Sequence, residues 1–337
     1  MKNINVAFVV WLNGPGEIQI REEELPQYGD NEILCSTIVS AISPGTELAA
    51  FKGLPPLRPN VTYPRLQGYC NVAKVEATGS SVSKFSKGDR ILSFQSHRSA
   101  FVIPETQALY KLPERANSDH IACAYLFHLG YNAVLRGGIR AGSRVLIIGL
   151  GVLGLTTVAN AAVAGADVYA LSDYSVPTEI AMQFGAVSVF QRKDLGALKE
   201  AIKPDLVDVV IVTTNSWSDW NIALQMVGQL GVIAVLGFPG RGERISTKNP
   251  LESQYFYMKQ IRIEAVGFSP ELPDGRGFCR FNERNNIEYI CRQIMSGRLN
   301  PESFISGRFE ATNIKEAYNS LMTRQSSPLT YLLEWKH

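Results

Sequence analysis

The segment from Arg144 to Gly154 constrains the fold most strongly, because an aliphatic run passes directly into a glycine-rich turn. Residues 145–148 are all aliphatic, and the turn reads Gly149-Leu150-Gly151-Val152-Leu153-Gly154. In such a strand–turn–helix unit the first glycine permits the turn and the second lets a pyrophosphate approach the backbone. The third lets helix and strand pack closely, and the helix N-terminus favours phosphate charge. This pattern predicts a dinucleotide site formed by Gly149, Gly151, Val152, Leu153 and Gly154.

Strand and helix patterns alternate around this turn. The predicted strands are nearly continuous apolar runs, as expected for strands buried on both faces, and cover residues 144–149, 167–171, 207–212 and 232–237. Helical patterns lie between or beside them, at residues 152–164, 178–184, 195–201 and 218–230. This alternation predicts an α/β fold with a doubly wound parallel sheet over residues 121–268, extended by one more strand at 260–267.

The segments before and after this region have a different pattern. Residues 1–120 contain short strand patterns broken by Gly and Pro, at 5–12, 32–41, 71–77 and 90–94, which predict a compact, mostly β domain. Residues 269–337 contain predicted helices at 285–296 and 313–323 and a final strand at 329–335. A chain of 337 residues is long enough for about two domains.

Bulk properties exclude several classes of protein. A net charge of +2 gives no reason to expect a nucleic acid or an anionic membrane as a partner. The apolar run at residues 6–12 is too short for a signal peptide core, and no stretch is long enough to span a bilayer. The five cysteines are scattered and include no C-x-x-C pair, which is typical of reduced thiols. We therefore expect a cytoplasmic protein whose partner is a small-molecule substrate.

Several segments carry a family resemblance. They are GPGEIQIREEELP (14–26), VSKFSKGDRI (82–91), LGYNAVLRGGIRAGSRVLIIGLGVLG (129–154), EIAMQFGA (179–186), DVVIVTT (208–214) and LGVIAVLGFPG (230–240). Together they resemble the medium-chain dehydrogenase/reductase superfamily over nearly the whole chain. The resemblance implies a GroES-like catalytic domain, made of residues 1–120 and 269–337, with an NAD(P)-binding Rossmann domain at 121–268 inserted in it. It also implies a homodimer formed through the strand at 260–267.

The zinc enzymes of this family hold a catalytic metal with a Cys-Gly-Thr-Asp segment, a Gly-His-Glu segment and a further Cys or Asp. The first segment here reads Ser43-Pro44-Gly45-Thr46-Glu47, the second reads Gly68-Tyr69-Cys70, and the third ligand position falls near Tyr125. Zinc normally needs three N, S or O ligands that can be deprotonated, and these residues do not supply them. The SPGTE segment is similar to a zinc-like branch that includes the bacteriochlorophyllide dehydrogenases. No metal is therefore expected.

An improvised metal site is the alternative. Cys70, Cys123 and His128 are each competent ligand types. The competing interpretation is that both cysteines are buried small hydrophobic residues.

Without zinc, a hydrogen-bond donor must stabilise the developing oxyanion. The resemblance places Thr46 where the zinc enzymes have the hydroxyl that carries the alcohol proton, and Tyr69 at the lost histidine. We predict that Tyr69 and Thr46 bind the substrate oxygen during hydride transfer, with Tyr125 as a third catalytic candidate. The alternative is that Tyr69 only fills the vacated metal pocket. Glu47 is expected to be structural.

The choice of nicotinamide cofactor depends on the end of the second strand of the sheet. Ser172 occupies the position at which an acidic residue binds the ribose of NAD, and a small residue there often accompanies NADP. The arginine expected within a few residues for NADP is absent, whereas Asp173 could reach the ribose and would repel a 2′-phosphate. NAD is therefore preferred, and NADP stays open. Thr213 and Gly237 complete the predicted cofactor-binding residues.

Three functional classes remain open at this point. The first is hydride transfer between NAD(P) and an alcohol or carbonyl compound, independent of zinc. The second is reduction of an activated C=C bond, as in quinone and enone reductases, and the third is a catalytically silent NAD(P)-binding module. As a further hypothesis, Arg276, Arg280 and Arg284 recognise an acidic substrate through bidentate hydrogen bonds, against the alternative of a solvated loop.

Overall fold

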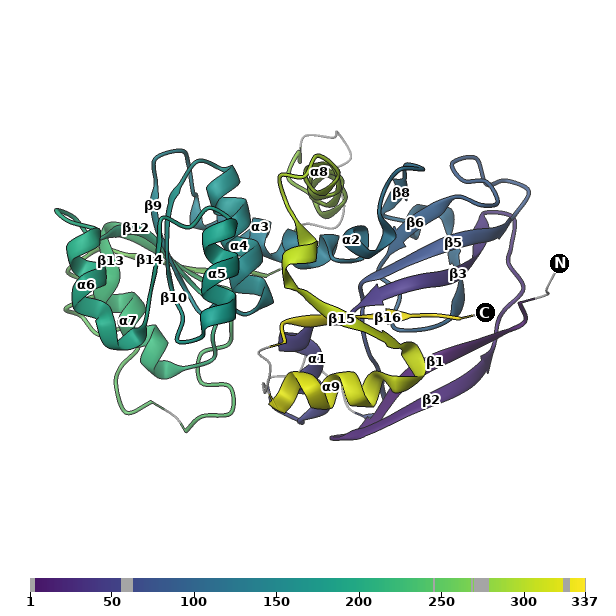
Figure 1. Cartoon of the computed structure of the whole chain (residues 1–337), viewed down its shortest axis with the longest axis horizontal. Coiled ribbons are helices and arrows are strands. Elements are labelled where there is room, and N and C mark those ends of the chain that lie inside the picture. Colours follow the sequence, from purple (N-terminus) through teal and green to yellow (C-terminus); the bar gives the residue numbers. More distant parts are fainter. Residues whose placement is uncertain are drawn as a thin grey trace. The chain divides into compact units, whose positions relative to one another are not determined.

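The computed structural model describes residues 4–55, 63–244, 246–267, 269, 279–323 and 328–336 (Figure 1). The chain forms two compact units. Unit 1 comprises Met1–Tyr125 together with Leu272–His337, and unit 2 comprises Leu126–Glu271. None of the helices within these ranges is both long enough and apolar enough to cross a lipid bilayer.

Unit 2 contains a six-stranded sheet in the order β11-β10-β9-β12-β13-β14, and every neighbouring pair is parallel. The strands are β9 (Arg144–Ile148), β10 (Asp167–Leu171), β11 (Ser188–Phe190), β12 (Val207–Val212), β13 (Val227–Val235) and β14 (Arg262–Ala265). The helices are α3 (Ala124–Gly137, which starts in unit 1), α4 (Val152–Val163), α5 (Ser175–Gln183), α6 (Leu195–Ala201) and α7 (Trp217–Met226). Figure 1 shows α4 and α5 on one side of the sheet and α6 and α7 on the other. The predicted doubly wound parallel sheet is confirmed.

The strand order reverses at β9, which lies between β10 and β12. In sheets of this type ligands bind at the carboxyl ends of the strands, at the point where the order reverses. The glycine turn follows the carboxyl end of β9, and the residues after β10 and β12 lie at the same edge of the sheet. The topology therefore places all of the predicted cofactor-binding residues near the carboxyl ends of the parallel strands.

The helix predicted over residues 218–230 is wrong beyond Met226, because β13 begins at Val227. Lys259 explains where α7 ends. Its Nζ donates to the backbone carbonyls of Leu224, Gln225 and Val227 at 2.8, 3.1 and 2.7 Å, and so satisfies carbonyls that a helix end leaves without partners. Lys259 comes more than 30 residues after these carbonyls, so the local pattern contains no signal for this end.

Unit 1 is built around two sheets. One has the order β2-β1-β4, and the other the order β15-β16-β3-β5-β6-β8, with β7 paired to β3. The strands are β1 (Val6–Gly14), β2 (Glu17–Glu24), β3 (Glu32–Ala41), β4 (Arg65–Leu66), β5 (Asn71–Thr78), β6 (Arg90–Ser93), β7 (Ala100–Pro104), β8 (Tyr110–Leu112), β15 (Ile305–Glu310) and β16 (Thr330–Glu334). The helices are α1 (Pro44–Phe51), α2 (Ser118–Ala122), α8 (Glu283–Met295) and α9 (Ile314–Thr323).

The two parts of unit 1 share one core, although unit 2 separates them in the sequence. β16 lies between β15 and β3, and pairs with β3 through Leu332 and Leu333. Tyr318 of α9 packs edge-on against Phe51 of α1, with ring centroids 5.4 Å apart. Both rings belong to a cluster of buried apolar residues from β1, α1, α9 and β16. The segment around α1 is therefore held by residues from both ends of the chain.

Candidate functional site

The glycine turn has the geometry that a dinucleotide requires. Gly149 has a φ of +93°, and a Cβ at Gly154 would lie 1.9 Å from the carbonyl oxygen of Gly149. Both positions therefore require glycine for backbone reasons. A Cβ at Gly151, by contrast, would meet no atom within 4 Å. The second glycine thus leaves space for a ligand, as the close approach of a pyrophosphate demands.

The N-terminus of α4 makes this site favour a negatively charged ligand. Gly151 is its N-cap, no side chain caps it, and its first turn contains no acidic residue. The first N–H groups of a helix have no partner within the helix and favour an anion. Val152 and Leu153 contribute two of these groups. The residues present therefore fit the pyrophosphate of a nicotinamide dinucleotide.

The backbone near the glycine turn is held by two residues that follow other strands of the sheet, Thr213 after β12 and Gly237 after β13. The Thr213 hydroxyl donates to the carbonyls of Ile148 and Gly149, at 3.0 and 2.9 Å. The backbone N–H of Gly237 donates to the Val212 carbonyl at 2.9 Å, and a Cβ at Gly237 would lie 2.2 Å from the Thr214 carbonyl oxygen. Both residues thus fix backbone close to the predicted site.

Asp173 is held by an arginine that is distant in sequence. The backbone N–H and Nη1 of Arg192 donate to the two carboxylate oxygens of Asp173, at 2.9 and 2.7 Å. The same guanidinium donates through Nε and Nη2 to both oxygens of the buried Asp219, at 2.7 and 2.8 Å. Hydrogen bonds from Arg192 lower the pKa of Asp173, first through the backbone N–H. Near the carboxyl end of β10, the Arg192 guanidinium therefore lies between the carboxylates of Asp173 and Asp219. Ser172, which precedes Asp173, is buried.

Sequence reasoning missed Arg192 because it lies 19 residues beyond Asp173, at the start of the segment that follows β11. The expectation that no arginine lies near the ribose-binding position holds only along the sequence. In space Arg192 contacts Asp173 directly. Parallel pairing of β10 with β11 is the reason, because it brings the two strand ends together.

Unit 1 contains a cluster of hydroxyl groups from residues that the resemblance aligns with the metal-binding segments of the zinc enzymes. Tyr69 donates a short hydrogen bond to Ser43 Oγ, and its hydroxyl oxygen lies 3.4 Å from Thr46 Oγ1. Ser43 is the N-cap of α1, Thr46 lies in its first turn, and Tyr69 follows Gly68, whose φ is +81°. The structure thus brings the predicted Thr46 and Tyr69 together and adds Ser43.

Tyr125 joins this cluster through its ring. Its centroid lies 5.3 Å from that of Tyr69 in an edge-to-face arrangement, and the Phe94 ring contacts its other side at 4.6 Å. Burial raises the pKa of the Tyr69 phenol above its ordinary value. Tyr69 therefore stays protonated at neutral pH and acts as a hydrogen-bond donor.

A buried carboxylate lies directly behind the hydroxyl cluster. Glu47 Oε1 accepts from the backbone N–H of Ser43 at 2.6 Å. Glu47 Oε2 contacts His97 Nε2 at 2.9 Å and accepts from the Tyr318 hydroxyl at 2.5 Å. The sequence contained no signal for His97 or Tyr318, which are 50 and 271 residues away from Glu47.

The residues at the expected metal position do not fit a zinc ion. Cys70 and Cys123 are buried, and burial raises the pKa of both thiols above the ordinary value, as for small buried apolar residues. His128 Nε2 is bonded to Ser269 Oγ at 2.9 Å, and burial lowers the pKa of His128 to about 4. Within the described part of the chain, no three His, Cys, Asp or Glu side chains are grouped to hold a metal. The described residues therefore give no support to the improvised Cys70, Cys123 and His128 site, and the absence of zinc stays a prediction.

The arginine hypothesis is wrong for Arg284. Its guanidinium donates to the backbone carbonyls of Thr106 and Ala108, at 2.5 and 2.8 Å, and so fastens α8 to the segment before β8. Arg280 is exposed, and its backbone carbonyl accepts from the Asn285 side chain. Arg276 lies outside the described residues.

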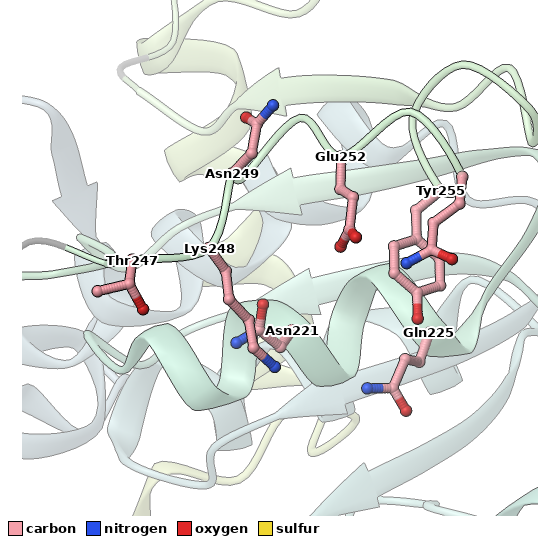
Figure 2. A pocket seen from close by; sticks show the side chains of 8 residues that line it. Asn221, Gln225, Thr247, Lys248, Asn249, Glu252 and Tyr255 are labelled. Carbon is pink, nitrogen blue, oxygen red and sulfur yellow. The ribbon is translucent and has the colours of Figure 1, made fainter.

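Unit 2 also has a polar hollow of about 380 Å³ beside α7. Figure 2 shows Asn221 and Gln225 of α7 on one side and the side chains of the segment after Thr247 on the other. None of the eight residues that line it belongs to the predicted catalytic or cofactor-binding sets.

Known proteins share both this fold and parts of this sequence. A family model described as "Zinc-binding dehydrogenase" matches residues 152–272. A sorbitol dehydrogenase from Bacillus subtilis is 26% identical over 69% of this chain and 75% of its own. A Sinorhizobium meliloti protein bound to NADP has a TM-score of 0.79 and 20% identity, over 98% of this chain and 99% of that one. An Escherichia coli alcohol dehydrogenase in complex with NADH has a TM-score of 0.78 and 18% identity, over 98% and 100%.

These likenesses and the glycine turn define the class of protein as a nicotinamide-dependent dehydrogenase or reductase with a GroES-like and a Rossmann domain. These likenesses support the medium-chain dehydrogenase/reductase superfamily that the sequence analysis predicted, and the predicted fold is confirmed.

Proposed function

We propose that the protein transfers hydride between a nicotinamide cofactor and an alcohol or carbonyl substrate without a zinc ion. The observation that carries this proposal is the hydroxyl cluster of Ser43, Thr46 and Tyr69, which stands where the family's zinc enzymes place a metal ligand set. Hydroxyls that donate hydrogen bonds stabilise a developing oxyanion, which is the task that zinc otherwise performs. The sorbitol dehydrogenase relative supports alcohols as the substrate class.

In the proposed mechanism the bound nicotinamide supplies or accepts the hydride. Tyr69 stays protonated and donates to the substrate oxygen, because burial raises its pKa. Thr46 offers a second hydroxyl at the same oxygen and carries the proton of an alcohol substrate. Tyr125 orients the Tyr69 ring through their edge-to-face contact. In unit 2, Gly151, Val152 and Leu153 hold the pyrophosphate at the start of α4.

We propose NAD as the preferred cofactor. The carboxylate of Asp173 is 47% exposed and can accept hydrogen bonds from ribose hydroxyls. The Asp173 carboxylate opposes a 2′-phosphate, and Asp173 and Asp219 together occupy the Arg192 guanidinium that could otherwise receive one. Relatives of this fold are known with NADP and with NADH, so the choice rests on these local charges.

We also propose that two copies of the chain associate through β14. This strand stands last in the order of its sheet, where it pairs with β13. A strand at the end of a sheet offers unpaired backbone groups to a second copy. Light scattering on purified protein tests this: a mass of twice 37.1 kDa is expected, and the mass of one chain would contradict it.

The function is tested by metal analysis and cofactor titration of the purified protein, followed by turnover assays with NAD(H) and NADP(H). The substrates are polyols and secondary alcohols for oxidation, and ketones, aldehydes and enones for reduction. We expect less than stoichiometric zinc, tight binding of NADH, and turnover of alcohols or carbonyl compounds. One zinc ion per chain would overturn the metal-free mechanism. Turnover of enones alone would establish C=C reduction instead, and cofactor binding without any turnover would favour the silent binding module.

A further inference from the structure

The hydroxyl cluster is formed by two segments that are separate in the sequence, and His97 contacts both of them. Tyr69 belongs to the turn at residues 67–70, whereas Ser43 and Thr46 belong to the start of α1. His97 holds the turn in two ways. Its backbone N–H donates to the Gln67 carbonyl at 2.7 Å, and its ring lies where a side chain at Gly68 would be, 2.5 Å from the position of a Cβ. His97 is fully buried.

The same ring reaches α1 through Glu47. His97 Nε2 lies 2.9 Å from Glu47 Oε2, and Glu47 Oε1 accepts the backbone N–H of Ser43 at 2.6 Å. A continuous set of contacts thus runs from the ring of His97 through Glu47 to Ser43, whose Oγ accepts from Tyr69.

The other ring nitrogen leads away from the site. His97 Nδ1 lies 2.8 Å from Ser40 Oγ, which also accepts from Trp335 Nε1 at 3.1 Å. All donors and acceptors match when Ser40 donates to Nδ1 and the neutral ring donates from Nε2 to Glu47. The two nitrogens therefore have different partners: Nε2 connects to the hydroxyl cluster through Glu47, and Nδ1 contacts Ser40 of β3.

We propose that His97 is a positioning residue, whose Nε2 bond to Glu47 fixes Ser43 Oγ within hydrogen-bond distance of Tyr69. The histidine thereby joins the two segments that a metal ion joins in the zinc enzymes of the family. Its consequence for turnover rests on the proposed function, but the positioning itself does not. A test of the Tyr69–Ser43 bond therefore needs no substrate.

The experiment uses two isosteric variants of the full-length protein with ¹³Cζ-labelled tyrosine. The longer amide side chain of His97→Gln keeps a nitrogen donor at the Nε2 position. The shorter amide side chain of His97→Asn places a polar group only at the Nδ1 position. The Tyr69 signal is assigned by its loss in Tyr69→Phe, and Ser43→Ala shows its position when the acceptor is removed. We expect His97→Gln to keep the wild-type position, and His97→Asn to move the signal toward that of Ser43→Ala. An unchanged signal in both variants, or equal displacement in both, overturns the proposal.

A second variant covers the case in which His97→Asn does not fold. Ser40→Ala removes the Nδ1 contact and leaves the bond between Nε2 and Glu47 in place. It is expected to leave the Tyr69 signal unchanged, and displacement in this variant counts against the proposal. NADH affinity, whose proposed pyrophosphate site lies in unit 2, is expected to stay at the wild-type value in the His97 and Ser40 variants.

Where turnover is found, the kinetics give a further readout. We expect kcat to fall about 10²-fold in His97→Asn, as for a reacting group displaced by about 1 Å. His97→Gln should stay within about tenfold of wild type, a difference of no more than about 1.4 kcal/mol. Equal losses in the two variants would show that His97 only supports the fold.

Discussion

The Tyr69 hydroxyl donates to Ser43 Oγ, and Thr46 Oγ1 lies 3.4 Å from the same phenolic oxygen. A pair of hydrogen-bonded hydroxyl groups has two protons. One proton forms the hydrogen bond between them, and the other can be donated to a third group. When Ser43 instead donates to the phenolic oxygen, the Tyr69 proton becomes available to a substrate oxygen. In this arrangement the phenol remains neutral and contributes through hydrogen bonding, because burial raises its pKa.

Tyr69→Phe removes the phenolic donor and keeps the ring that contacts Tyr125. We expect kcat/KM to fall by about 10²–10³-fold, as when one donor to an oxyanion is lost. The measurement is steady-state kinetics with the substrate found in the panel. Tyr110→Phe is the matched control, because its hydroxyl contacts Met295 Sδ within unit 1. A Tyr69→Phe enzyme with unchanged kcat/KM would show that Tyr69 only fills the pocket.

Two glycine substitutions separate packing from ligand binding in the turn. A Cβ at Gly154 would lie 1.9 Å from the Gly149 carbonyl oxygen, so Gly154→Ala should lower stability by about 1–3 kcal/mol. A Cβ at Gly151 meets no atom of the chain within 4 Å, and the φ of Gly151 is −71°. Gly151→Ala should therefore keep the melting temperature and lose NADH affinity.

Thermal unfolding together with fluorescence titration of NADH measures both effects. Equal NADH affinity in wild type and Gly151→Ala would contradict the placement of the pyrophosphate at this turn. A Gly154→Ala protein as stable as wild type would contradict the close packing of α4 on β9.

Asp173→Ala is expected to shift the cofactor preference toward NADPH. The substitution removes a carboxylate that repels a 2′-phosphate, and leaves the backbone N–H and Nη1 of Arg192 without the acceptor that they have now. The ratio of the Kd of NADPH to that of NADH should fall at least about tenfold, or about 1.4 kcal/mol. Asp167→Ala is the matched control, since Asp167 is an exposed aspartate at the opposite end of β10. If both variants keep the wild-type ratio, Asp173 does not set the preference.

Unit 2 should lose stability in mild acid because of His128. Ser269 Oγ donates to Asn132 Oδ1 at 2.8 Å, so His128 Nε2 donates to Ser269 and the ring is neutral. Burial lowers the pKa of His128 from 6.5 to about 4. The unfolded chain therefore binds a proton that the folded chain does not bind between these values. The stability is fully present above pH 6.5 and is lost as the pH falls toward 4.

The expected loss is about 3 kcal/mol relative to His128→Gln, which keeps a donor to Ser269 and does not titrate. Urea unfolding of both proteins between pH 7 and pH 4 measures it, followed by a signal from unit 2. Parallel pH profiles for the two proteins would mean that His128 takes up its proton in the folded state as readily as in the unfolded state.

The sequence predicted those features that depend on local pattern. The apolar runs around Gly149–Gly154 were sufficient for the parallel sheet, because buried strands and glycine turns leave a direct signal. The resemblance placed Thr46 and Tyr69, which the structure brings to 3.4 Å. Features that depend on distant pairing could not be predicted. Examples are Arg192 beside Asp173, His97 beside Glu47, and Lys259 at the end of α7.

The position of β16 between β15 and β3 sets an order of assembly. Residues 330–334 are translated after all six strands of unit 2, and β3 obtains this neighbour only when they appear. Because domains fold as units during synthesis, unit 2 can complete its sheet while unit 1 still lacks a central strand. The nucleotide-binding unit can therefore fold before unit 1 is complete. The hydroxyl cluster, whose helix α1 packs on α9, can be completed only after residues 330–334 have been synthesised.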